Sequence, residues 1–180
     1  MEFRAVAFDV GHTLIDEQID AASFVLPIRI MPHVYKILPQ IGLPMAAWSN
    51  TRSAREADVR NLLEAAGIAK FFSWVITSVD AGCRKPHPGF FRFALGKCGL
   101  AEKEVLFVGN QLNTDICGGL QCDIKTVWLS GEAYRSPEDT TLLDSVSPDY
   151  VIESLAELPA LLKRIQTLGN AKSHPDTWEC

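Results

Sequence analysis

The stretch FRAVAFDVGHTL, residues 3–14, decides the fold class of this chain. Its first part, 3–10, is short, mostly apolar and rich in Val and Phe, and it carries the carboxylate of Asp9 near its end. Gly11 follows and bounds the run. A run of this length and composition before a glycine favours a buried β-strand. We therefore expect Asp9 at the end of a strand, exposed at a glycine turn and closely held.

Similar short apolar runs recur along the chain and alternate with helix-like segments. This alternation predicts an α/β fold, in which helices cover both faces of a parallel sheet. Right-handed crossovers make such a sheet doubly wound, or Rossmann-like, and we expect about five parallel strands. The further candidate strands are 43–48, 74–77, 105–109 and 124–129, with a short edge strand at 150–152.

The helix-like segments carry start and stop signals. Ser53 is a candidate N-cap with Glu56 three residues later, a capping-box pattern, and Gly67 ends that segment. Asp115 is expected to help cap the helix that it opens. The other candidate helices are 32–41, 90–98, 115–120 and 155–165.

Polar residues follow several of the predicted strands at the point where each strand ends. Asp9, Ser49, Asn50 and Asn110 all occupy such positions. In open α/β sheets, ligands bind beyond the carboxyl ends of the strands. We therefore expect these four side chains to gather on one rim of the sheet.

Length and composition set limits on the class of protein. The chain has 180 residues, of which 47% are hydrophobic and 22% are charged, and this suits one globular domain over 1–166 with a flexible tail at 167–180. The net charge of -5 gives no electrostatic reason to expect nucleic acid or an anionic membrane as a partner. Five cysteines without a C-x-x-C pair, and no visible signal peptide, favour reduced thiols and a cytoplasmic location.

Four short motifs on the predicted rim supply what phosphoryl transfer requires. A carboxylate can attack phosphorus and form an acyl phosphate. A hydroxyl, backbone N–H groups and a lysine can neutralise the phosphoryl oxygens, while oxygen ligands can hold Mg²⁺. The motifs are FDVGHTL at 8–14, AWSN at 47–50, GCRKP at 82–86 and GN-x4-D at 109–115.

These motifs, in this order, resemble those of the haloacid dehalogenase (HAD) superfamily, the aspartate-nucleophile phosphatases. The runs KPHPGF at 85–90 and VWL at 127–129 fit as well, and the resemblance spans about residues 3–165. It implies a hydrolase of phosphorylated substrates. Position by position, it implies that Asp9 is the nucleophile, that Ser49 and Asn50 bind phosphoryl oxygens, and that Lys85 stabilises the charge on nucleophile and phosphate.

The resemblance also implies a Mg²⁺ site. Asp9 contributes its carboxylate and Gly11 its backbone carbonyl, while Asn110 and Asp115 complete the set of ligands. Thr13 supports the first loop. The superfamily usually has Asp where this chain has Asn110. Because an amide carries no charge, we expect weaker metal binding.

A second departure is Gly11, where most phosphatases of the superfamily have an Asp that protonates the leaving group and activates water. Losing a general acid–base typically costs about 10²–10⁴-fold in rate. His12 or His87 could replace it, but we favour ordinary loop histidines. Dehalogenases, phosphonatases and transport ATPases also lack this Asp. The alternatives to a phosphatase are thus an impaired binding or scaffold protein on the same fold and, ranked last, a dehalogenase or phosphonatase.

The interval between Asp9 and Ser49 is too short for the helical cap domain of related enzymes. We expect a vestigial cap or linker at 16–31 and an open site, which would suit a bulky substrate or an oligomer. If the apolar residues of this segment do not fold onto the core, they form a candidate interface for a homo-oligomer. These residues are Phe24, Val25, Leu26, Ile28, Ile30 and Met31.

Overall fold

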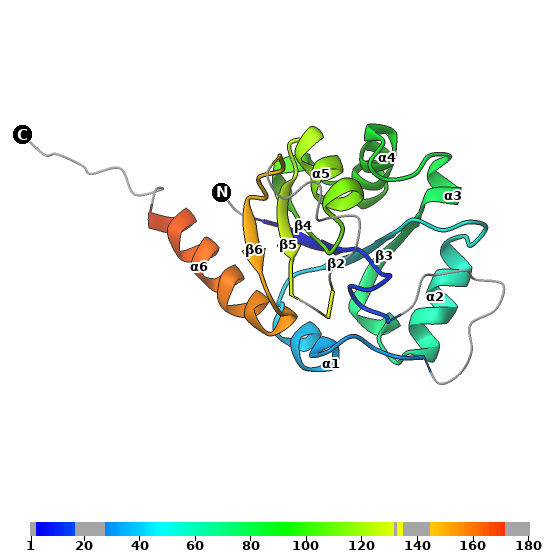
Figure 1. Ribbon diagram of the computed structural model, residues 1–180, viewed down its shortest axis with the longest axis horizontal. Helices are drawn as coiled ribbons and strands as arrows, with labels where there is room; N and C mark the ends of the chain where they lie inside the picture. Colours follow the sequence, from blue (N-terminus) through cyan, green and yellow to red (C-terminus); the bar gives the residue numbers. More distant parts are fainter. Residues whose placement is uncertain (1–2, 17–27, 132, 135–144, 172–180) are drawn as a thin grey trace, which may run out of the picture.

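A computed structural model describes residues 3–16, 28–131, 133–134 and 145–171. Within these residues the centre of the fold is a sheet of six parallel strands in the order β3-β2-β1-β4-β5-β6 (Figure 1). The doubly wound α/β fold is thus confirmed, and the short edge strand adds a sixth strand to the five expected. The strands are β1 (Ala5–Phe8), β2 (Met45–Ser49), β3 (Phe72–Thr77), β4 (Val105–Gly109), β5 (Lys125–Leu129) and β6 (Tyr150–Ile152).

Helices cover both faces of the sheet, with α1, α2 and α6 on one side and α3, α4 and α5 on the other (Figure 1). Among the described residues, none of the helices is long and apolar enough to span a membrane. Several are preceded or followed by short 3₁₀ turns, and a π-helical turn, Leu112–Ile116, precedes α5. The helices are α1 (Val34–Ile37), α2 (Glu56–Ala65), α3 (Ser78–Ala81), α4 (Pro88–Cys98), α5 (Cys117–Gln121) and α6 (Leu158–Ala171).

The strand β1 is buried along its whole length, because its apolar side chains pack on both faces of the sheet. Val6 and Phe8 belong to the core beneath α1, α2 and α6, whereas Ala7 belongs to the core beneath α4. Burial on both faces is typical of a central parallel strand. From β1 the chain crosses to β2 on one side, and β4 lies on the other. The carboxyl end of β1 is therefore the topological switch point, where α/β proteins bind ligands.

The start of α2 differs from the prediction. The helix begins at Glu56, with Arg55 and not Ser53 at the N-cap position. The backbone N–H of Arg55 donates to the carboxylate of Asp58 (2.9 Å), and that of Glu56 donates to Asp80 (2.8 Å). The predicted Ser53 cap is wrong because an acceptor distant in sequence satisfies the first turn.

The described part of the segment predicted as a vestigial cap pairs with the first motif. The N–H of Asp16 donates to the carbonyl of Arg29 (2.9 Å), and the N–H of Met31 donates to that of Leu14 (3.0 Å). Met31 is buried, and Ile28 and Ile30 pack against the main core. Residues 17–27 lie outside the described part, so the predicted interface stays a prediction.

Two predicted helices have different lengths in the structure. The segment predicted at 32–41 is a single α-helical turn, α1, followed by the 3₁₀ turn Leu38–Gln40, whose Pro39 lies in its first turn. At the other end of the chain, α6 extends to Ala171, into the stretch for which we predicted a flexible tail. Residues 172–180 lie outside the described part.

Candidate active site

The side chain of Lys85 lies at the centre of the rim and is 3% exposed. Its Nζ donates to Asp9 Oδ1 (2.6 Å), to Asp115 Oδ1 (2.7 Å) and to the carbonyl oxygen of Trp48 (2.9 Å). An ammonium group has three N–H donors, so these acceptors use all of them. A buried cation is tolerated only when it is paired and hydrogen-bonded, and here each donor has a partner.

Asp9 follows β1 directly and is 8% exposed. Burial raises the pKa of its carboxyl to about 6, because the opposing effect of the Lys85 ammonium is partly offset by the nearby Asp115 carboxylate. For Lys85, burial lowers the pKa, but Asp115 and Asp9 together raise it above its ordinary value. The lysine is therefore held as a cation against two carboxylates, and Asp9 is mostly ionised at neutral pH.

The side chain of Asn50 is paired with the backbone of Lys85. Its Oδ1 accepts from the N–H of Lys85 (2.8 Å), and its Nδ2 donates to the Lys85 carbonyl (2.9 Å). Nη1 of Arg84 also donates to the Thr51 carbonyl (2.9 Å), so two residues of each loop take part. These bonds join the loop after β2 to the loop that carries Lys85. One N–H of the Asn50 amide is used in this pairing, so a contact from Asn50 to a phosphoryl oxygen would come from its second side-chain N–H or from its backbone N–H.

Ser49 is the last residue of β2 and is buried beside the end of β1. The loop that follows it is held at Thr51, whose N–H donates to the hydroxyl of Ser78 (2.9 Å) and whose carbonyl accepts from that hydroxyl (2.9 Å). Ser49 and Asn50 thus precede a backbone segment that hydrogen bonds hold in place.

Asn110 follows β4 and is 2% exposed. Its Nδ2 donates to the carbonyl of Tyr134 (2.7 Å), and its Oδ1 accepts from the hydroxyl of Thr13 (3.3 Å). The indole N–H of Trp128 donates to the backbone carbonyl of Asn110 (3.0 Å). A carboxylate here would face the Tyr134 carbonyl without a proton to donate. The structure therefore gives a physical reason for asparagine at this position.

Asp115 completes the acidic side of the rim. Its Oδ1 accepts from Lys85, and its Oδ2 accepts from the backbone N–H of Gln111 (3.1 Å), which precedes the π-helical turn. The predicted cap is therefore wrong: the N-cap position of α5 is Ile116, without a side-chain hydrogen bond, and Asp115 lies inside the π-helical turn, where it accepts from the N-cap residue of that turn. Gly109 is required for this approach, because a Cβ atom at that position would lie 2.5 Å from Oδ2 of Asp115.

Comparison with known proteins agrees with this geometry. The HAD-hydrolase-like family model matches residues 82–158. The chain is 31% identical to pyrophosphatase PpaX of Oceanobacillus iheyensis over 131 residues, which are 73% of this chain and 59% of that protein. The chain belongs to the HAD superfamily. The motif order on the rim of its sheet is the order of that superfamily.

Two further HAD proteins show the extent of the similarity. The chain is 32% identical to glyceraldehyde 3-phosphate phosphatase of Methanocaldococcus jannaschii over 142 residues, 77% of this chain and 59% of that protein. It thus spans 59% of the length of both curated relatives. The structure of the putative HAD-hydrolase YfnB from Bacillus subtilis, bound to magnesium, is also similar. The match includes 90% of this chain and 99% of the YfnB chain. Its TM-score of 0.71 at 16% identity shows a shared fold.

In this HAD chain the first loop has no carboxylate two residues after Asp9. Gly11 is half-buried and does not have the positive φ that favours glycine. The loop closes through the N–H of His12, which donates to the Ile15 carbonyl (2.6 Å), and through the N–H of Ile15, which donates to the Val10 carbonyl (3.0 Å). This pairing does not use the carbonyl of Gly11.

Neither of the two histidines considered as replacements is hydrogen-bonded to Asp9 in the part of the chain that the structure describes. The ring of His12 lies 3.8 Å from the carboxylate of Asp16, measured from Nδ1 to Oδ1. His87 caps α4, and its Nδ1 accepts from the N–H of Gly89 (3.0 Å). Both positions agree with the interpretation as loop histidines.

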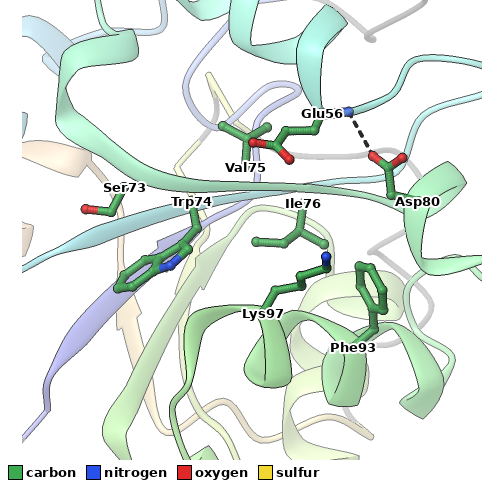
Figure 2. Close-up of a pocket in the computed structure, with 8 residues that line it drawn as sticks. All are labelled: Glu56, Ser73, Trp74, Val75, Ile76, Asp80, Phe93 and Lys97. Carbon is green, nitrogen blue, oxygen red and sulfur yellow. Dashed lines mark hydrogen bonds between the residues drawn. The ribbon is translucent and has the colours of Figure 1, made fainter.

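A hollow of about 370 Å³ lies at the outer edge of β3, apart from the rim residues (Figure 2). Trp74 extends from the edge strand β3 itself, whereas Phe93 and Lys97 come from α4, and Nζ of Lys97 is 5.5 Å from the centre of the Phe93 ring. The upper wall of the hollow contains Glu56 and Asp80, which are joined by the hydrogen bond from the Glu56 N–H to the Asp80 carboxylate. None of the motif residues lines this hollow, so it is not part of the candidate active site.

Proposed function

We propose that this chain is a Mg²⁺-dependent phosphatase that acts through an aspartyl-phosphate intermediate at Asp9. The observation that carries the proposal is the position of Lys85, whose ammonium group is fixed by three acceptors and lies 2.6 Å from Asp9 Oδ1. A cation placed in advance beside the nucleophile can stabilise the charge that develops on the phosphoryl oxygens. The similarity to HAD proteins named as phosphatases supports this function.

The chain's own residues would divide the work as follows. The Asp9 carboxylate attacks phosphorus, and Lys85 neutralises both the nucleophile and the incoming phosphoryl group. The hydroxyl of Ser49 and an N–H group of Asn50 bind phosphoryl oxygens at the end of β2. The pairing between the Asn50 side chain and the Lys85 backbone keeps the loop after β2 and the loop that carries Lys85 in a constant relative position.

The residues on the rim fit a Mg²⁺ ion by the chemistry of their donors, all of which are oxygen atoms. Asp9 and the carbonyl of Gly11 would hold the ion, with Asn110 and Asp115 beside them. The carboxylates of Asp9 and Asp115 carry the negative charge of this set, and each gives one oxygen to the Lys85 ammonium. When bound, Mg²⁺ would reduce the repulsion between the carboxylate and the phosphate. The magnesium bound in the YfnB structure supports this choice of ion.

A phosphorylated small molecule is the proposed substrate class, since the relatives are named for pyrophosphate and glyceraldehyde 3-phosphate. If residues 16–31 leave the site open, a bulky phosphorylated substrate or a second copy of the chain would suit it.

A second candidate function rests on Asn110 and Gly11. Asn110 is committed to neutral partners, Thr13 and Tyr134, and Gly11 offers no acid–base group. These features favour a binding or scaffold protein that keeps the HAD fold but not its turnover.

Phosphate release from a panel of phosphate monoesters and phosphoanhydrides, with and without Mg²⁺, tests these proposals. We expect Mg²⁺-dependent turnover by the wild type and its loss in Asp9→Asn, which keeps the size of the side chain. If Asp9→Asn were as active as the wild type, Asp9 would not be the nucleophile. No turnover under any condition, together with no Mg²⁺ binding by calorimetry, would favour the scaffold protein.

A further inference from the structure

Among the residues that the structure describes, the rim around Asp9 has a nucleophile, but none of the side chains beside it is placed to protonate a leaving group. Gly11 has no side chain, and all three N–H donors of Lys85 are used. Asp115 is held as an acceptor by Lys85 and by the N–H of Gln111. The described contacts place His12 beside Asp16 and use His87 as the cap of α4. Since none of these described groups offers a proton to the leaving group, we take solvent as its source.

This arrangement discriminates between classes of phosphorylated compound. An alkyl phosphate must release an alkoxide, which is strongly basic and leaves slowly without a proton. An acyl phosphate releases a carboxylate, whose conjugate acid has a pKa of about 4. A phosphoanhydride that contains a phosphate monoester releases that monoester, whose second pKa is about 6. Neither of the last two leaving groups needs protonation at neutral pH.

Resting on the proposed function, we infer that this site takes activated phosphates, namely acyl phosphates or phosphoanhydrides, whose leaving group departs as an anion. A carboxylate oxygen of Asp9 forms a bond to phosphorus. The bond between phosphorus and the bridging oxygen breaks, and its electron pair remains on the departing carboxylate or phosphate. No proton is transferred in this step.

The lack of an acid–base side chain at position 11 also affects the second step, the hydrolysis of the aspartyl phosphate. Water attacks the phosphorus of the aspartyl phosphate, releases inorganic phosphate and returns the Asp9 carboxylate, and one proton of the water passes to solvent. Because no carboxylate at position 11 accepts that proton, this step is slow. Phosphorylated Asp9 therefore accumulates during turnover of an activated substrate.

Gly11→Asp is a suitable comparison because the backbone at this position does not have a conformation reserved for glycine. Gly11 is half-buried beside the rim and does not have the positive φ found at Gly42, Gly67, Gly82 and Gly99. Unlike those glycines, it is not held in a conformation that a side chain would strain.

The decisive measurement is kcat/KM for a series of aryl phosphates that differ in the pKa of the leaving phenol, in buffer with Mg²⁺. For the wild type we expect a steep fall as this pKa rises. For Gly11→Asp we expect a shallow dependence, with a gain of about 10²–10⁴-fold on the most basic leaving groups and little gain on the most acidic. His12→Gln and His87→Gln are controls, and each should keep the steep dependence of the wild type.

Intact-protein mass spectrometry after mixing with acetyl phosphate gives a second readout. We expect one added phosphoryl group on the wild type, removed by hydroxylamine and absent in Asp9→Asn. A shallow dependence in the wild type would overturn the inference and leave the phosphatase proposal intact, as would a steepened dependence in His12→Gln or His87→Gln. No turnover of any substrate and no phosphorylated protein would overturn both. The wild-type slope is decisive even if Gly11→Asp does not fold.

Discussion

The two sides of the rim around Asp9 use the same residue type differently. On the β2 side, the amide of Asn50 is paired with the backbone of Lys85 and so positions a cation. On the β4 side, the amide of Asn110 is paired with the Thr13 hydroxyl and the Tyr134 carbonyl. Asn50 thus positions the cationic Lys85, whereas Asn110 occupies the position at which a HAD protein usually has a carboxylate. The β2 side thus retains the groups for binding a phosphoryl group, whereas the β4 side keeps the carboxylate of Asp115 but has neutral hydrogen bonds in place of a charge at Asn110.

The largest effect should come from Lys85→Met, which removes the cation that joins the two sides. Asp9 and Asp115 would then be buried carboxylates without their shared partner. We expect a loss of about 3–5 kcal/mol in the free energy of unfolding, measured by urea denaturation, together with loss of phosphatase activity.

The double variant Lys85→Met with Asp115→Asn sharpens this prediction. Because the second change removes one of the two like charges, it should recover part of the lost stability. Strictly additive losses would show that Lys85 and Asp115 do not interact energetically, contrary to their 2.7 Å contact.

A smaller effect is expected from Asn110→Asp, which restores the superfamily's usual carboxylate on the β4 side. The carboxylate cannot donate to the Tyr134 carbonyl, so we expect a loss of about 1–3 kcal/mol without Mg²⁺. If the new carboxylate also binds metal, Mg²⁺ should raise the melting temperature of this variant more than that of the wild type. The matched control is Asn61→Asp, the same change at an exposed position of α2. Equal stabilities for both variants and the wild type would contradict the structural role of Asn110.

The smallest effect concerns Asp80, on the β2 side. Partial burial raises the pKa of its carboxyl, but hydrogen bonds from Thr77, the N–H of Glu56 and Arg55 lower the pKa below its ordinary value of 3.8 overall. A lowered pKa in the folded state means that the stabilisation is present above pH 3.8 and is lost as pH falls towards the folded pKa. We expect Asp80→Asn to lose about 1 kcal/mol at neutral pH, as for loss of a helix cap.

The pH dependence of stability separates this effect from a general loss of packing. Denaturation midpoints measured from pH 7 to pH 3 should converge for Asp80→Asn and the wild type at the acid end. Glu64→Gln, at an exposed position of the same helix α2, is the control and should follow the wild type throughout. A constant difference between Asp80→Asn and the wild type at all pH values would contradict the electrostatic origin.

Much of the fold was predictable because apolar runs of strand length alternate with helix-like segments. The positions of Asp9, Ser49 and Asn110 at strand ends followed from the same pattern, since parallel strands end on one rim. Element boundaries were less predictable. Ser53 and Glu56 matched a local capping pattern, yet α2 starts where Asp80 supplies an acceptor from another element. Local patterns do not register partners that are distant in sequence.

For the candidate site, the sequence by itself determined the kinds of chemical group present: a carboxylate after a strand, a lysine in a loop, and a glycine where an acid–base residue is usual. The tertiary structure decided how these groups are used. It placed the Lys85 ammonium between Asp9 and Asp115, paired Asn50 with the Lys85 backbone, and set the Tyr134 carbonyl against Asn110. The reason is physical. The composition of a motif limits which hydrogen bonds a residue can make, but only folding brings together the donors and acceptors that choose among them.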